Sequence, residues 1–126
     1  MISRVLVVDD DLLGQALAES VLALLGAEVV PAKDGTECLA GFRMQRFDIA
    51  FMDHLMPNMS GLEAIAEIRR IEGGLVWTRT PNVALTACAF PSEVEEFSCA
   101  GADDVLLKPY RVAELAAILK KWIPRH

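Results

Sequence analysis

Four short apolar runs, each closed by a polar side chain, constrain most strongly what this chain can fold into. They lie at residues 5–8, 49–52, 83–85 and 105–107, and each has the length of a buried β-strand. Segments with the length and apolar spacing of amphipathic helices separate the runs. This alternation is typical of an α/β fold in which a doubly wound parallel sheet carries helices on both faces.

The other segments predict a fifth strand and five helices. Residues 28–32 are expected to form that strand, at an edge of the sheet because Pro31 cannot donate a ladder hydrogen bond. A first helix is expected over residues 12–25, and capping-box patterns at 34–37, 60–63 and 92–95 predict three further helix starts. The expected apolar stripe of the first helix is Leu13, Leu17, Val21, Leu24 and Leu25. That of the last helix is Val112, Leu115, Ile118, Leu119 and Trp122, with Pro124 at its end.

Composition fits one domain and excludes several function classes. The chain has 126 residues, the size of one domain with one core, and 53% of them are hydrophobic. A net charge of -6 argues against direct nucleic-acid binding. No apolar stretch could span a bilayer and no signal peptide is recognisable, so a cytoplasmic protein that does not bind membranes by itself is expected. Cys38, Cys88 and Cys99 lack metal-type spacing and are expected to be buried thiols in a reducing compartment.

Five polar residues follow or close the apolar runs: Asp9, Asp10, Asp53, Thr86 and Lys108. Because chemistry collects at the carboxyl ends of strands in an open parallel sheet, these side chains should converge on one pocket. Three carboxylates repel one another unless a cation joins them. A threonine hydroxyl and a lysine ammonium would complete a cradle for a phosphoryl group.

Each of the five residues has a candidate role. The acid pair suits Mg²⁺, with Asp10 as direct ligand and Asp9 acting through water. A tight turn over residues 56–61 could bring the backbone carbonyl of Leu55 to the same ion. Asp53 could act as a nucleophile toward phosphorus. Lys108, which precedes a proline that favours a cis peptide, could bind the arriving phosphoryl group.

Local structural roles remain an alternative for each residue taken alone. An acid before a helix is commonly an N-cap, a threonine commonly ends a strand, and a lysine before a helix is commonly a surface residue. His54 should point away from the pocket wall that Asp53 uses, because side chains alternate along a strand. Asp103 and Asp104 are expected in a solvated turn. The occurrence of all five residues at strand ends favours a site.

Together these motifs resemble the receiver domain of two-component response regulators. The matching stretches are residues 7–10, Asp53 with Met56, Pro57 and Gly61, and residues 85–87, 101–104 and 108–109. The resemblance implies a flavodoxin-like sheet with strand order 2-1-3-4-5, in one receiver domain over residues 1–126 with no effector domain. It also implies a signalling phosphoacceptor, which catalyses only its own phosphorylation and slow self-dephosphorylation, rather than an enzyme.

The resemblance also implies roles for the site residues. Asp9, Asp10, Asp53 and the Leu55 carbonyl would hold Mg²⁺, for which Mn²⁺ can substitute. Asp53 would take a phosphoryl group from a phosphohistidine of a histidine kinase or phosphotransfer protein. Thr86 and Lys108 would then bind the transferred group.

Two further features concern switching and docking. Many family members carry an aromatic residue at the position of Val105, so the output of this chain would use another rearrangement, or simple phosphoryl transfer, in place of an aromatic switch. The first helix resembles receivers of hybrid histidine kinases, which dock a histidine phosphotransfer domain. The expected docking residues are Leu13, Gln15, Leu17 and Pro109. The chain is expected to be a monomer or a weak dimer.

Three other functions fit the sequence less well than this one. Phosphatases with an aspartyl nucleophile place a second aspartate two residues later, where this chain has Leu55. Nucleotide- and flavin-binding members of the same architecture need a phosphate-binding loop, but no glycine-rich fingerprint follows the first run. The complete set of five residues argues against a degenerate receiver that only docks partners, and Val105 is the feature that keeps this alternative open.

Overall fold

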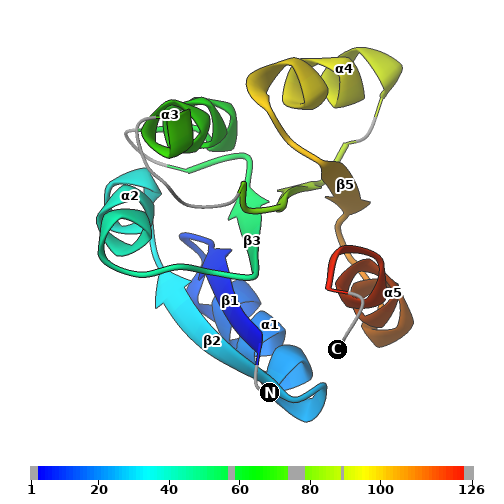
Figure 1. Cartoon of the computed structure of the whole chain (residues 1–126). Helices are drawn as coiled ribbons and strands as arrows, with labels where there is room; N and C mark the ends of the chain where they lie inside the picture. The colour runs from blue at the N-terminus through cyan, green and yellow to red at the C-terminus, as the bar shows by residue number, and fades with distance from the viewer. Residues whose placement is uncertain (1–2, 57–58, 74–78, 89, 124–126) are drawn as a thin grey trace.

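The computed structural model describes residues 3–56, 59–73, 79–88 and 90–123, in which strands and helices alternate (Figure 1). The five strands are all parallel and lie in the order β2-β1-β3-β4-β5, as expected. The strands are β1 Ser3–Val8, β2 Ala27–Ala32, β3 Ile49–Asp53, β4 Asn82–Thr86 and β5 Asp104–Leu107. The helices are α1 Leu12–Leu24, α2 Gly35–Met44, α3 Gly61–Gly73, α4 Pro91–Ala100 and α5 Val112–Trp122.

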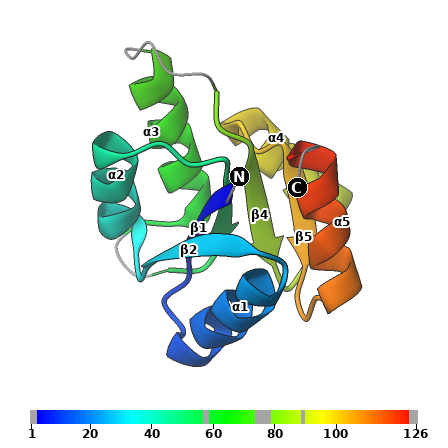
Figure 2. The ribbon, with the colours of Figure 1, turned by 60° about the horizontal axis from the view of Figure 1, so that its bottom comes forward.

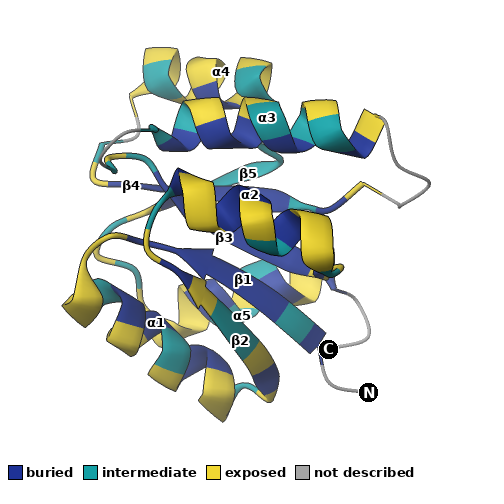
Figure 3. Ribbon diagram, turned by 90° about the vertical axis from the view of Figure 1, so that its left-hand side faces the viewer, coloured by how far each residue is buried: buried dark blue, intermediate teal, exposed yellow. Residues whose placement is uncertain are grey.

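The sheet separates two hydrophobic cores. Alternate side chains of β1 point to opposite faces, so Val5 and Val7 pack with α1 and α5, whereas Leu6 and Val8 pack with α2, α3 and α4. Figure 2 shows these two groups of helices on opposite sides of the sheet. In Figure 3 the central strands are dark blue and the outer faces of the helices are largely yellow. Burial on both faces explains the uninterrupted apolar runs.

The strand that contains Pro31 lies at an edge, where only β1 pairs with it. Proline is therefore tolerated, because a missing backbone N–H is not needed on the open side of an edge strand. This strand begins at Ala27, one residue before the predicted start.

The apolar stripe predicted for α1 is largely wrong. Leu13, Leu17 and Leu24 are exposed, whereas the buried face consists of Gln15, Ala18, Val21 and Leu22. The amide nitrogen of Gln15 donates hydrogen bonds to the carbonyls of Val7 and Ala32, at 3.3 and 3.0 Å. These bonds compensate the burial of a polar side chain, which a pattern based on hydrophobicity does not anticipate.

Two of the three predicted capping boxes begin helices. Asp34 accepts a hydrogen bond from the backbone N–H of Glu37 at 2.9 Å. Ser60 and Glu63 exchange hydrogen bonds between their side chains and backbone N–H groups, at 3.2 and 3.3 Å. Each bond satisfies a backbone donor that the first helical turn leaves unpaired.

The third predicted capping box, at residues 92–95, is wrong. Helix α4 begins at Pro91 with Phe90 as its N-cap, and no side chain caps it. Proline suits the first helical position because its missing N–H has no partner there. The helix ends at Gly101, which adopts the left-handed conformation with φ of 113°.

In α5, Leu115 and Leu119 are buried and Ile118 and Trp122 pack against the core, but Val112 is exposed. The predicted end at Pro124 lies outside the described residues.

Candidate functional site

The carboxyl ends of three strands bring two acids and a base into contact. Asp9 follows β1, Asp53 ends β3 and Lys108 follows β5. The Nζ atom of Lys108 lies 3.0 Å from Oδ1 of Asp53 and 3.2 Å from Oδ2 of Asp9. The Lys108–Pro109 peptide bond is cis. The parallel register of the sheet therefore brings these residues together, as their positions in the sequence predict.

Asp9, Asp10 and Asp53 form an acidic cluster. Each offers a carboxylate oxygen within 4.8 Å of the others; Asp9 and Asp53 are buried and Asp10 is exposed. Oδ1 of Asp9 accepts the backbone N–H of Asp11 at 2.9 Å. A Cβ atom at Gly14 would lie 2.9 Å from the Asp9 carboxylate, so the small residue leaves room for that acid. Clustered carboxylate oxygens that reach solvent through Asp10 fit a hard dication such as Mg²⁺.

Burial and crowding set the protonation of this cluster. Burial raises the pKa of Asp53, the contact with Lys108 opposes this effect, and the charges of Asp9 and Asp10 add to it, so that the pKa lies above its ordinary value. For Lys108, burial alone lowers the pKa, but the two carboxylates outweigh burial and raise it. The lysine is therefore a cation that offsets part of the negative charge of the cluster.

The segment after Asp53 is held closely against the strand. The backbone N–H of Gly61 donates to the carbonyl of His54 at 2.9 Å. A Cβ atom at Gly61 would lie 2.9 Å from the Cα of His54 and closer still to the carbonyl oxygen of Asp53, so this approach requires glycine. Leu55 lies in this segment with an exposed side chain. Residues 57 and 58 of the predicted turn lie outside the described residues.

The ring of His54 points toward α4 and not toward the acidic cluster. It meets the ring of Phe97 in α4 edge-to-face, with centroids 4.9 Å apart and planes at 79°. This placement agrees with the expected alternation of side chains at the end of β3.

Thr86, at the end of β4, shares a cavity of about 400 Å³ with Asp53 and Lys108. Its hydroxyl donates to the carbonyl of Cys88 at 2.9 Å and accepts the Cys88 backbone N–H at 3.2 Å. Glu93 in the first turn of α4 also lines this cavity, with Oε1 3.4 Å from the hydroxyl oxygen. Sequence reasoning missed Glu93, although its place just after the β4 end could have indicated it.

A second cavity, of about 360 Å³, lies beside the cluster. Its lining includes Asp9, Leu17, Lys108, Pro109 and Tyr110. Two of the predicted docking residues, Leu17 and Pro109, therefore border the acidic site.

The other two predicted docking residues differ in exposure. Leu13 is 79% exposed on α1. Gln15 is buried against the sheet and cannot meet a partner, so its predicted docking role is wrong.

Val105 is half-buried and packs against the core beneath α2, α3 and α4. A cavity of about 350 Å³ lies beside it, bordered by Val94 and Ser98 of α4. No aromatic side chain lines this cavity among the described residues.

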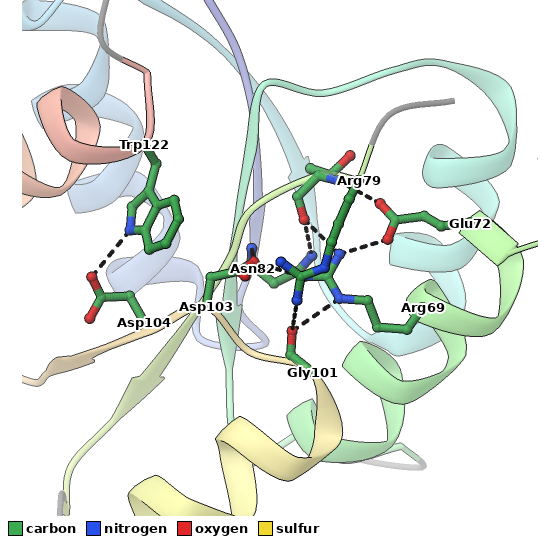
Figure 4. A network of polar contacts seen from close by, with 9 residues as sticks. Arg69, Glu72, Arg79, Asn82, Gly101, Asp103, Asp104 and Trp122 are labelled. Carbon is green, nitrogen blue, oxygen red and sulfur yellow. Dashed lines mark hydrogen bonds and ion pairs between the residues drawn. The ribbon is translucent and has the colours of Figure 1, made fainter. Parts of the chain in front are cut away.

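Asp103 is buried, contrary to the expected solvated turn (Figure 4). Arg69 reaches from α3 to Asp103 at 2.7 Å and to Glu72 at 2.6 Å, and it also donates to the carbonyls of Thr80 and Gly101. These contacts lie before the starts of β4 and β5, at the end of the sheet opposite the acidic cluster. We call them the Arg69 clamp.

Arg79 and Asp104 make further polar contacts near the clamp. Arg79 pairs with Asp103 and donates to the carbonyl of Gly101 at 3.1 Å. Asp104 pairs with Lys121 and accepts the indole N–H of Trp122 at 3.1 Å (Figure 4). Neither acid of the 103–104 pair is free in solvent. Of the three cysteines, only Cys38 is buried, so the expectation for Cys88 and Cys99 is wrong.

Comparison with known proteins gives a consistent family. The model of the response regulator receiver domain matches residues 5–120. Sensor protein GacS of Pseudomonas syringae pv. syringae is 37% identical over 119 residues, which are 94% of this chain and 13% of that protein. Sensor histidine kinase AruS of Pseudomonas aeruginosa is 40% identical over 116 residues, or 92% of this chain and 12% of the kinase. The chain thus spans about an eighth of the length of these relatives.

Solved structures of receiver proteins share this fold. Chemotaxis protein CheY4 of Vibrio cholerae has a TM-score of 0.90 and 31% identity, and the match covers 98% of this chain and 100% of that chain. The receiver domain of sensor histidine kinase PA1611 from Pseudomonas aeruginosa has a TM-score of 0.88 and 36% identity, covering 98% and 99%. That structure holds a magnesium ion in its active site cleft. Within the described part of this chain, no helix combines the length and apolarity needed to cross a membrane.

Proposed function

The chain belongs to the response regulator receiver domain family of two-component signalling, and from this premise we propose that Asp53 is its phosphoacceptor. One observation carries the proposal: Asp53 is a buried carboxylate that contacts Lys108 and shares its cavity with Thr86. A buried acid that depends on a cation from another strand end destabilises the fold unless it has a further role.

The proposed reaction is a phosphoryl transfer. A carboxylate oxygen of Asp53 attacks the phosphorus of a phosphohistidine, the O–P bond forms as the P–N bond breaks, and the imidazole leaves with a proton. Lys108 and the hydroxyl of Thr86 donate hydrogen bonds to the transferred oxygens. Hydrolysis later breaks the P–O bond and releases inorganic phosphate. Catalysis in this scheme is mostly positioning and electrostatics.

Mg²⁺ is the proposed cofactor, with Mn²⁺ as a substitute. Asp10, Asp53 and the Leu55 carbonyl would hold the ion directly, and Asp9 would hold it through water. The ion supplies positive charge that offsets the carboxylates and the incoming phosphoryl oxygens. The carboxylate oxygens within 4.8 Å of one another support this assignment, and so does the magnesium in the related PA1611 receiver domain.

The proposed partner is a histidine kinase or a histidine phosphotransfer protein. The similarity to GacS and AruS supports the kinase class. Leu13, Leu17 and Pro109 are exposed apolar residues close to the acidic cluster, where a partner that delivers a phosphoryl group must approach. The partner surface that suits them is apolar, and the net charge of -6 favours basic groups around it over nucleic acid.

Borohydride trapping tests the proposed acceptor. Reduction converts an aspartyl phosphate to homoserine, which peptide mapping locates. After treatment with acetyl phosphate and Mg²⁺, the proposal expects homoserine at position 53. Homoserine at position 9 or 10 instead would overturn the assignment.

A further inference from the structure

We propose that Glu93 opposes the phosphorylated state, because its carboxylate and a phosphoryl group on Asp53 compete for the hydroxyl of Thr86. The inference rests on the proposed phosphoacceptor role of Asp53. Glu93 is half-buried in the first turn of α4 and lines the same cavity as Asp53, Thr86 and Lys108. It is therefore an acid that lines, together with Asp53 and Thr86, the space that a phosphoryl group would enter.

The hydroxyl of Thr86 has a single proton. Its oxygen already accepts the backbone N–H of Cys88, and its proton faces two acceptors, the Cys88 carbonyl at 2.9 Å and Glu93 Oε1 at 3.4 Å. Glu93 also accepts a hydrogen bond from the thiol of Cys88, and this bond raises the pKa of that thiol. For Thr86 to donate to a phosphoryl oxygen, its proton must turn away from both of these acceptors.

The charges that line the cavity also disfavour the phosphorylated state. Among the described residues that line it, Lys108 is the one lysine or arginine, and two carboxylates already share its charge. A phosphoryl group on Asp53 would bring further negative charge to the side of the cavity that Glu93 faces. Like charges in a partly desolvated space disfavour the state that brings them together.

Hydrolysis would relieve this repulsion. In a loose transition state, negative charge moves from the phosphoryl oxygens to the departing carboxylate of Asp53, which Lys108 contacts at 3.0 Å. Water supplies the new oxygen on phosphorus, and the P–O bond to Asp53 breaks. Glu93 should therefore shorten the lifetime of the phosphorylated protein.

The same competition links the site to α4. Loss of the Thr86–Glu93 contact frees the first turn of α4 from the end of β4, and repulsion pushes that turn outward. This coupling does not need an aromatic ring at position 105, where the chain has Val105. Glu93 thus acts as a positioning residue, through Thr86 and through its charge.

Decay of the phosphorylated protein tests the inference. Wild type, Glu93→Gln, Glu93→Ala and the control Glu95→Gln are loaded with acetyl phosphate and Mg²⁺, freed of donor and followed by intact mass. Glu95 is exposed on the same helix and lines no cavity with Asp53. Both Glu93 variants should hold the phosphoryl group longer, roughly threefold to tenfold, and Glu95→Gln should match wild type.

Salt separates a charge effect from a merely structural one. The difference between Glu93→Gln and wild type should shrink as ionic strength rises, because salt screens the repulsion. Adduct in all variants with the same lifetime would overturn the inference and leave the phosphoacceptor role intact. No adduct in the wild type would instead overturn the proposed function.

Discussion

The ammonium of Lys108 lies 3.0 Å from a carboxylate oxygen of Asp53, although 55 residues separate them in the chain. The contact exists because β3 and β5 both end at the same edge of the sheet, with β4 between them. The same ammonium also meets Asp9 at 3.2 Å. In the absence of other cations, Lys108 is therefore the main counterion of the acidic cluster.

This relationship predicts that Lys108→Ala binds Mg²⁺ more tightly than wild type. The ammonium and the metal ion compete for the carboxylates of Asp9 and Asp53, so removal of the ammonium should lower the dissociation constant by roughly threefold to tenfold. Isothermal titration with Mg²⁺ measures the change. The control is Lys33→Ala, which removes an exposed lysine paired with Glu37. Weaker binding by Lys108→Ala, or equal changes in both variants, would contradict the prediction.

Asp53→Asn should stabilise the protein in chelator at neutral pH. The pKa of Asp53 is raised above its ordinary value of 3.8 by burial first and by Asp9 and Asp10. The folded state therefore binds more protons than the unfolded state, so this group's contribution is fully present below pH 3.8 and is lost as pH rises through the raised pKa. With solvent screening, the gain in the free energy of unfolding of Asp53→Asn is about 1 kcal/mol, or about 4 °C in Tm.

Thermal unfolding at several pH values checks this sign. The advantage of Asp53→Asn over wild type should grow as pH rises above 3.8 and then level off. An advantage that is the same at all pH values, or a lower Tm for the variant at neutral pH, would argue against crowding of the carboxylates.

Arg69→Ala should be strongly destabilising. Its guanidinium pairs with the buried carboxylates of Glu72 and Asp103, so removing it takes this cation from Glu72 and leaves Asp103 with the more exposed Arg79. Breaking buried pairs of this kind costs about 3–5 kcal/mol, measured by denaturant unfolding. The control is Arg70→Ala, whose exposed pair with Glu67 should matter little. Similar losses of unfolding free energy in both variants would show that the Arg69 clamp stabilises the protein no more than an exposed ion pair does.

Leu13→Glu should slow phosphoryl transfer from a protein donor and leave the reaction with acetyl phosphate unchanged. A charge on the exposed face of α1 would disrupt an apolar contact without touching Asp53. The donor is a phosphorylated histidine phosphotransfer protein chosen because it transfers to the wild type. Leu24→Glu is the matched control, since Leu24 is 83% exposed at the other end of the same helix. Equal loss in both variants would exclude a docking site near the acidic cluster.

Much of the fold follows from local patterns in the sequence. The apolar runs locate the central strands because burial on both faces requires uninterrupted hydrophobicity. Pro31 predicts an edge strand, and Asp34 and Ser60 predict helix starts, because each depends on backbone chemistry that neighbouring residues determine. The convergence of Asp9, Asp53, Thr86 and Lys108 follows once the strands are parallel.

The features that were missed depend on distant partners. Gln15 is buried because the carbonyls of Val7 and Ala32 accept its amide, and the side chain of Asp103, just before β5, is covered because Arg69 reaches it from α3. Neither partner is visible in the local sequence. The exposure of Leu17 has the same cause, since α1 turns the face that carries Gln15 and Ala18 toward the sheet.

Intact mass after treatment with acetyl phosphate tests the central claim most directly. Wild type and Asp53→Asn are each incubated with the donor, with Mg²⁺ and with chelator, and weighed. The account predicts one added phosphoryl group on the wild type only when Mg²⁺ is present, and none on Asp53→Asn. An equal adduct on Asp53→Asn, or a folded wild type that neither binds Mg²⁺ nor takes up a phosphoryl group, would contradict it.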